Sequence, residues 1–181
     1  MMSQLSQSVV TCSYNLVTPE EIFGRISRLQ KGLGRASLSG AVIIDGINMF
    51  YYTGTLQNGL LFVPAEWEAI FFIRRSFELA EKETPLRTLV RLKSFAEIPE
   101  GLKAHGHHVA RLGLDEATVQ VSMFKKLSGA FRESVFEDIS LMLAMIRSIK
   151  SNYEVGLIRE AGKRHEAIYG RMGTLRRMGT L

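Results

Sequence analysis

The stretch IRSIKSNYE, residues 146–154, carries the clearest structural signal in this chain. Ser151 and Glu154 have the S-x-x-E spacing of a capping box, in which the serine oxygen accepts a hydrogen bond from the third helical amide and the glutamate reaches back to the serine amide. One face of the helix that starts here is formed by residues three or four positions apart: Tyr153, Leu157, Ala161, His165 and Ile168. Such a face normally packs against another surface.

The composition indicates one globular domain in a reducing compartment. The 181 residues allow a sizeable core, and 46% hydrophobic with 23% charged residues is ordinary for a soluble protein. The single cysteine, Cys12, excludes an internal disulfide, and we expect it to be chemically inert. Residues 1–10 have no signal-peptide pattern and no apolar run could span a bilayer, so we expect a cytoplasmic protein without a membrane partner.

The net charge of +5 is concentrated near the C-terminus. Residues 1–146 contain fifteen Lys and Arg against fifteen Asp and Glu, whereas residues 147–181 contain eight basic and three acidic residues. A nucleic-acid-binding protein would carry a basic stripe with interleaved aromatic residues on its folded body. We therefore expect a solvated basic helix and tail, and no nucleic-acid partner.

Alternating helices and strands predict a mixed-sheet α/β domain. Residues 1–17 are expected to be a flexible leader, and Thr18 is expected to cap a helix that buries four apolar residues and ends at Gly32 and Gly34. The buried residues of that helix are Ile22, Ile26, Leu29 and Leu33. The apolar runs at 41–44, 60–63 and 67–73 predict strands, the last two as an antiparallel pair.

The remaining pattern continues the alternation as far as the capping box. We expect helices at 76–83, 99–106, 140–149 and from the cap Asp115 to about Leu127, and strands at 86–92, 109–114 and 135–139. Residues 18–150 are thus predicted to form one domain, followed by a helix over 151–170. The repeated RMGTL at 171–175 and 177–181 has two glycines and no periodic apolar face, so we expect a basic tail rather than a helix.

A second motif, NMFYYTG, follows the first predicted strand. Asn48 is expected to cap one helical turn, and Tyr51 and Tyr52 to place their rings against the sheet. Gly54 permits a left-handed turn out of this helix.

The order of these motifs resembles the N-terminal domain of the creatinase/prolidase/aminopeptidase P family of metallopeptidases. The resemblance covers about residues 18–169, and its motif residues are Asn48, Tyr51, Thr53, Gly54, Arg147, Lys150, Ser151 and Glu154. It implies a ribonuclease H-like α/β domain and a linker helix leading to a catalytic domain that binds two divalent metal ions. It also implies a homodimer in which Thr55, Leu56, Gln57 and Asn58 help to line the neighbouring subunit's substrate pocket.

The catalytic ligands of that family, two Asp, one His and two Glu, would lie beyond the linker helix. The thirteen residues after Ile168 include no Asp, His or Glu, so we expect this chain to hold no metal or other cofactor and to have no catalytic residues. The leading hypothesis is a non-catalytic domain of an Xaa-Pro peptidase, with a role in dimerisation and in shaping the substrate pocket.

Alternative sites and functions stay open at this point. Asp45, at a strand end, is more consistent with a turn than with ligand binding, and His105, His107 and His108 have no carboxylate or cysteine at ligand spacing. His165 is expected to be a packing residue. The alternatives are an enzyme that uses Asp45 or the histidines, and an independent module that binds a small ligand or a protein.

Overall fold

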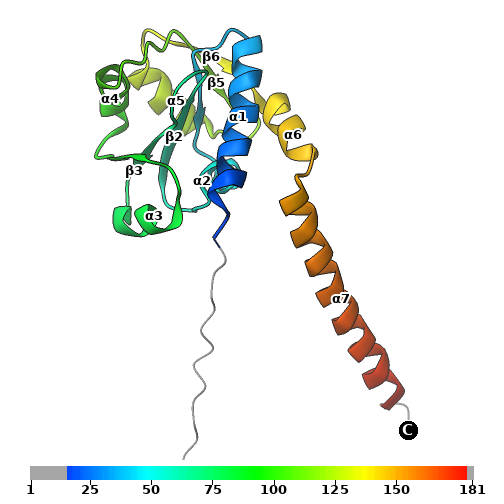
Figure 1. The fold of residues 1–181 in the computed structure, drawn as a ribbon. Coiled ribbons are helices and arrows are strands. Elements are labelled where there is room, and N and C mark those ends of the chain that lie inside the picture. Colours follow the sequence, from blue (N-terminus) through cyan, green and yellow to red (C-terminus); the bar gives the residue numbers. More distant parts are fainter. Residues whose placement is uncertain (1–15, 179–181) are drawn as a thin grey trace, which may run out of the picture.

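The computed structural model describes residues 16–178, which form a sheet flanked by helices and a long projecting helix (Figure 1). The six strands lie in the order β4-β3-β2-β1-β5-β6. Their bounds are β1 Gly40–Ile43, β2 Gly59–Pro64, β3 Ile70–Ile73, β4 Thr88–Arg91, β5 Arg111–Leu114 and β6 Val135–Asp138. The helices are α1 Pro19–Arg35, α2 Gly46–Thr53, α3 Phe77–Glu83, α4 Ile98–Ala104 after the 3₁₀ turn η1 Phe95–Glu97, α5 Val121–Ala130, α6 Ser140–Ser148 and α7 Asn152–Met178.

The sheet is mixed, as its sequence pattern predicted. β1 pairs antiparallel with β2 and parallel with β5, and β2 pairs antiparallel with β3. The predicted pair of runs 60–63 and 67–73 is therefore confirmed, although the second strand begins only at Ile70. Trp67 has a φ of 79°, which lies outside the β region of regular strands, so the turn extends further than we predicted.

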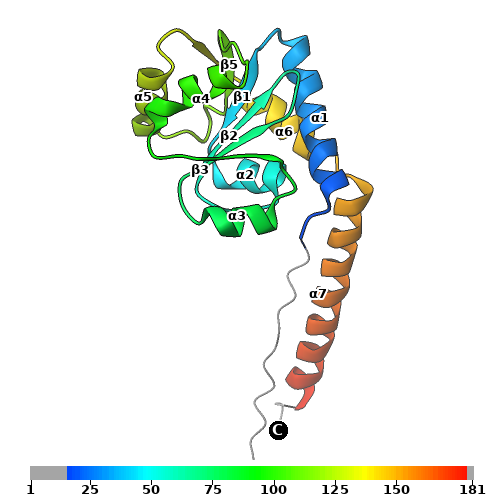
Figure 2. The ribbon, with the colours of Figure 1, turned by 60° about the vertical axis from the view of Figure 1, so that its left-hand side comes forward.

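Helices cover both faces of the sheet. Alternate strand residues point to opposite faces, so Ile43 packs with α1, α2 and α6 whereas its neighbour Val42 packs with α4 and α5. Figure 2 shows α1 and α6 on one side of the strands and α4 and α5 on the other. Because both faces are covered, the central strands are continuous apolar runs.

The first helix forms as the sequence predicted. The Thr18 hydroxyl accepts a hydrogen bond from the Glu21 amide at 3.4 Å, and Pro19 occupies the first helical position. The predicted apolar face, from Ile22 to Leu33, is buried. The helix continues through both glycines to Arg35.

The bounds of α4 and α5 also differ from the prediction. The Asp115 backbone carbonyl holds a turn, and α5 begins six residues later, at Val121. Its N-cap is Gln120, whose side chain makes no capping hydrogen bond. The helix predicted over 99–106 begins at Ile98 and ends at Ala104, because Gly106 turns left-handed with a φ of 80°.

The largest difference is the length of α7. The helix continues to Met178 instead of stopping near residue 170, so residues 171–178 are helical rather than an irregular tail. The leucine, methionines and arginines of this segment are good helix formers, and their propensity outweighs the two weak positions Gly173 and Thr174. In both views α7 runs away from the body of the domain (Figures 1 and 2). None of the helices within residues 16–178 is apolar enough over a sufficient length to cross a membrane.

Candidate functional site

Helix α2 holds the NMFYYTG motif and lies at the carboxyl end of β1. Its N-cap is Asp45, whose carboxylate accepts a hydrogen bond from the Asn48 amide at 2.8 Å. The prediction that Asn48 caps the helix is therefore wrong, and Asp45 has the structural role that its position between strand and turn favoured. Gly54 ends the helix in a left-handed conformation with a φ of 76°, as predicted.

Asn48 is instead the centre of a buried polar cluster. Its side-chain amide donates to Asp45 at 2.9 Å and to Asp115 at 3.0 Å, and its carbonyl oxygen accepts from Arg147 at 2.9 Å. One amide thus separates two carboxylates and fixes the end of α6 against β1 and β5. The second carboxylate oxygen of Asp115 is buried and has no hydrogen-bond partner among the described residues.

The two tyrosines of the motif pack edge to face, with 5.0 Å between their ring centres. Tyr52 is fully buried against the sheet, and burial, followed by the nearby Tyr51, raises the pKa of its phenol above the usual range. The Tyr51 ring lies beneath the Arg25 guanidinium at 4.2 Å, and its hydroxyl accepts from Arg28 at 3.3 Å. Burial also raises the pKa of Tyr51.

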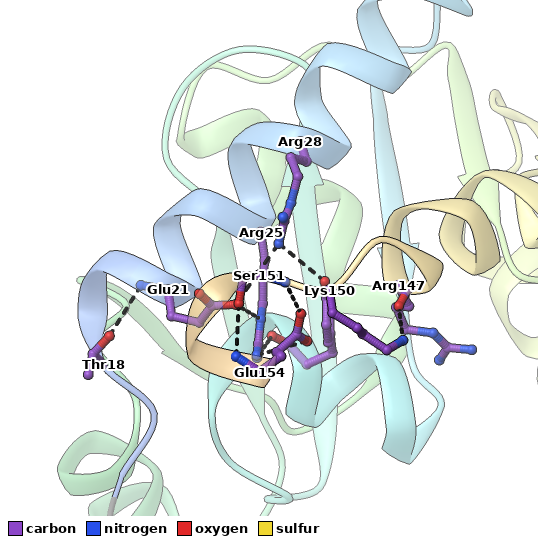
Figure 3. Close-up of polar contacts among 9 residues, drawn as sticks. Thr18, Glu21, Arg25, Arg28, Arg147, Lys150, Ser151 and Glu154 are labelled. Atoms are coloured by element: carbon purple, nitrogen blue, oxygen red, sulfur yellow. Dashed lines mark hydrogen bonds and ion pairs between the residues drawn. The ribbon is translucent and has the colours of Figure 1, made fainter. Parts of the chain in front are cut away.

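Arg25 connects α1, α2 and α7. Although charged, it is only 4% exposed, and each of its three nitrogens has a partner. Its guanidinium donates to Glu21 at 2.8 Å, to the Tyr51 carbonyl at 3.0 Å and to Glu154 at 3.2 Å. Figure 3 shows Arg25 reaching from α1 toward Glu154 and the start of α7.

The predicted capping box is present at the start of α7. Ser151 accepts from the Glu154 amide at 3.1 Å, and the Glu154 carboxylate accepts from the Ser151 amide at 2.9 Å. The Ser151 hydroxyl also donates to Glu21 at 3.0 Å. We call Glu21, Arg25, Ser151 and Glu154 the junction cluster, because they join α7 to α1 (Figure 3). Beside it, Lys150 donates to the Arg147 carbonyl.

The segment 55–58 alternates buried and exposed residues. Thr55 is buried, and its hydroxyl donates to Glu83 at 2.5 Å, while the Gln57 amide donates to the same carboxylate at 3.3 Å. The Asn58 carbonyl accepts from the Arg74 amide at 2.8 Å. Leu56 lies between these anchored residues with its side chain 69% exposed.

Leu56 lines an open apolar depression of about 540 Å³ with Ile47 and Phe50, both from the exposed side of α2. Asp45, Gly46 and Thr118 complete its rim. Helix α2 thus has one face whose polar groups contact α1 and α6, and an exposed apolar face beside segment 55–58.

The histidines make separate contacts in the structure. His107 packs edge to face on Phe62 with 5.3 Å between ring centres, and burial, with a smaller contribution from His105, lowers its pKa. His105 contacts the Gly101 carbonyl at 2.8 Å, and His165 is exposed on α7. Within residues 16–178 no group of three or more His, Cys, Asp or Glu lies close enough together to hold a metal ion. Cys12 lies outside the described residues.

The sequence patterns did not predict Arg25, the central residue of the junction cluster. Arg25 falls between Ile22 and Ile26 on the buried face of α1, and Glu21 lies four residues before it. A charged residue within an apolar helix face, with an opposite charge one turn away, was the available signal.

Sequence comparison places most of the chain in one family. Residues 25–149 match the model of the creatinase/prolidase N-terminal domain. An Xaa-Pro dipeptidase of Pyrococcus furiosus is 27% identical over 139 residues, which are 76% of this chain and 38% of that protein. The chain thus spans well under half the length of this curated relative.

Solved structures show the same fold. An Xaa-Pro dipeptidase from Bacillus anthracis matches 85% of this chain and 43% of its own with a TM-score of 0.75 at 20% identity. The N-terminal domain of the cytoplasmic peptidase PepQ from Mycobacterium tuberculosis matches 68% of this chain and 98% of its own with a TM-score of 0.60 at 21% identity. The prolidase from Pyrococcus furiosus has a TM-score of 0.61 at 26% identity, covering 72% of this chain and 40% of its own.

Proposed function

Because this chain belongs to the family of creatinase/prolidase N-terminal domains, we propose that it is the non-catalytic domain of an Xaa-Pro dipeptidase-like metallopeptidase. In this proposal it forms a homodimer and shapes the substrate pocket, while two divalent metal ions are bound by a separate catalytic domain. The likeness to PepQ, a cytoplasmic peptidase, supports a cytoplasmic location for this chain as well.

The observation that carries the proposal is the apolar depression beside α2. Ile47 and Leu56 are largely exposed, although each is a large aliphatic residue. A contiguous exposed apolar surface on a folded domain is typical of a binding surface. We therefore assign this depression to contact with a second subunit, where it would close an apolar substrate pocket.

The anchoring of segment 55–58 supports the pocket-shaping role. Thr55 and Gln57 both donate to Glu83, so the backbone on either side of Leu56 is fixed. A fixed backbone presents the leucine with little loss of conformational entropy on binding. A loop without these anchors would bind more weakly for the same contact area.

The uncovered face of α7 is the second surface for self-association. Leu157 is 50% and Ile168 is 55% exposed on the same helix face. Covering these side chains in a second copy would remove apolar area from water, and homo-oligomers mostly close with two-fold symmetry.

Light scattering on the full chain at high micromolar concentration tests the dimer. The expected result is a dimer that dissociates in Leu157→Glu/Ile168→Glu or in Ile47→Glu/Leu56→Glu, whichever carries the interface. Leu141→Glu, on the exposed side of α6, is the matched control and should remain dimeric. A wild-type protein that stays monomeric, or equal dissociation of the control, contradicts the dimer and favours the alternative of an independent binding module.

The non-catalytic assignment is tested by turnover of an Xaa-Pro dipeptide with added Mn²⁺, Co²⁺ or Zn²⁺. We expect no hydrolysis by the purified chain. Activity that persists through repurification and disappears in Asp45→Ala or His107→Ala would show that this domain is itself catalytic.

A further inference from the structure

We propose that the junction cluster is a latch that fixes the direction in which α7 leaves the domain, with Arg25 as its positioning residue. The inference goes beyond the proposed function, because it concerns the orientation of one helix and holds whatever that helix contacts. It rests on how α7 is attached to the body and on the chain that precedes it.

The connection before α7 is short, and its last residue, Ser151, accepts the first helical hydrogen bond of α7 from the Val155 amide at 2.9 Å. Helix α6 ends at Ser148 and α7 begins at Asn152. Between them, Ile149 has extended backbone angles of −89° and 104°, and its side chain is exposed. A rotation about these few residues would swing all 27 residues of α7.

The first turn of α7 is held by charge-assisted hydrogen bonds. Glu154 uses one carboxylate oxygen for Arg25 and the other for the Ser151 amide, so its position is fixed from two sides. Ser151 in turn donates to Glu21, which is also bonded to Arg25. The four residues therefore form a closed ring of contacts between α1 and α7, in which the Ser151–Glu154 link uses backbone amides (Figure 3).

Arg25 itself has one orientation available. Its third nitrogen is bonded to the Tyr51 carbonyl and its flat guanidinium stacks on the Tyr51 ring, so α2 determines where the guanidinium points. Because the group is buried, salt screens its attraction for Glu154 much less than it screens a surface pair. The direction of α7 is thus set by a rigid part of the body.

A matched pair of charge reversals tests the latch. Glu154→Lys places two cations together at the junction, whereas Glu160→Lys breaks the exposed Arg164–Glu160 pair on the same helix. Spin labels at Lys31→Cys on α1 and Lys163→Cys on α7, in a Cys12→Ser background, report the distance between helix and body by pulsed electron resonance. Light scattering determines whether each sample is monomeric. The samples are diluted until they are monomeric, so that the spin-label distance does not depend on dimerisation.

The expected result is one narrow distance distribution for the wild type and for Glu160→Lys. In Glu154→Lys the population in the wild-type orientation falls roughly tenfold relative to other orientations, as expected for the loss of a charge-assisted hydrogen bond. Glu154→Gln, which preserves the capping box, should give a smaller shift in the same direction. If Glu154→Lys does not fold, Glu154→Gln alone decides.

Two results would overturn the latch. One is an unchanged distribution in the folded Glu154 variants, which would mean that other contacts hold α7. The other is equal broadening in Glu160→Lys, which would mean that the charge of the helix, and not the junction, sets its direction.

Discussion

The body of the domain and helix α7 differ in how far their apolar side chains are buried. In the body, both faces of a six-stranded sheet are covered by helices, and strands β1 and β3 are buried along their whole length. Helix α7 is attached at its first turn, and beyond that turn the large apolar side chains as far as Tyr169 are exposed. The difference indicates that the body supplies the stability of the fold, whereas α7 contributes little to it and matters through its direction and exposed face.

Two ion pairs, one at the junction and one along α7, differ in the same way as the body and α7 do. Arg25–Glu154 lies between elements and is mostly buried, while Arg164–Glu160 lies along α7 with both side chains largely exposed. Exposed pairs contribute about 0–1 kcal/mol, but breaking a buried one leaves a charge without a partner. Of these two arginine–glutamate pairs, only Arg25–Glu154 at the junction is therefore expected to hold two elements together.

The largest effect is expected in the body. Ile43→Ala removes a 1% exposed side chain between α1 and the sheet, so it should reduce the free energy of unfolding by about 2–5 kcal/mol through lost burial and a cavity. Chemical denaturation measures the change. An unmoved midpoint would show that the core lies elsewhere.

Removal of the central amide of the polar cluster should have the next largest effect. Asn48→Ala leaves Asp45 and Asp115 without the donor between them, so we expect a loss of about 1–3 kcal/mol in the same measurement. Gln57→Ala is the matched control, since that amide makes one 3.3 Å hydrogen bond to Glu83 in a half-buried position. Equal losses in the two variants would contradict a special role for Asn48.

The titration of His107 should produce a smaller, pH-dependent effect. Burial, and secondarily His105, lowers the pKa of His107 in the folded state, so the unfolded chain binds the proton more readily. The contribution to stability is therefore complete above the unfolded pKa of about 6.5 and is lost as the pH falls through the lowered folded pKa. Denaturation between pH 4.5 and 7.5 should show this slope, and His107→Asn should reduce it, with His108→Asn as the control.

The smallest effect is expected on α7. Ile168→Ala truncates a half-exposed side chain, so in the monomer it should change the free energy of unfolding by less than about 0.5 kcal/mol. A loss comparable to that of Ile43→Ala would mean that α7 packs on the body more extensively than its exposure indicates.

The sequence predicted those parts of the fold that depend on short-range patterns. The Ser151–Glu154 capping box, the buried face of α1 and the left-handed Gly54 follow from spacing and residue type alone. The β2–β3 pair was also predictable, because two apolar runs are separated by a proline break. The prediction of the α2 N-cap failed because a neighbouring residue competed for the same role. Asp45 replaced Asn48 as the N-cap because it comes one turn earlier and its carboxylate reaches the amide of Asn48.

The candidate site was less predictable, because its contacts join distant segments. Spacing shows that Glu154 bonds locally to Ser151, but its bond to Arg25 depends on how α1 and α7 cross. The apolar depression likewise combines α2 with segment 55–58 and Thr118, which approach only in the folded sheet. Whether segment 55–58 lines a substrate pocket stays a prediction.

The junction cluster also has a consequence for synthesis of the protein. Arg25 and Glu154 are 129 positions apart, so the arginine is made long before its partner. At about 5–20 residues per second, α1 leaves the ribosome several seconds earlier than the first turn of α7. During that interval Arg25 has Glu21 and Tyr51 within reach but not Glu154, and the ring of contacts closes only when the first turn of α7 has emerged. Completion of the junction therefore comes after the strands and helices that lie between Arg25 and Glu154 in the sequence have been made.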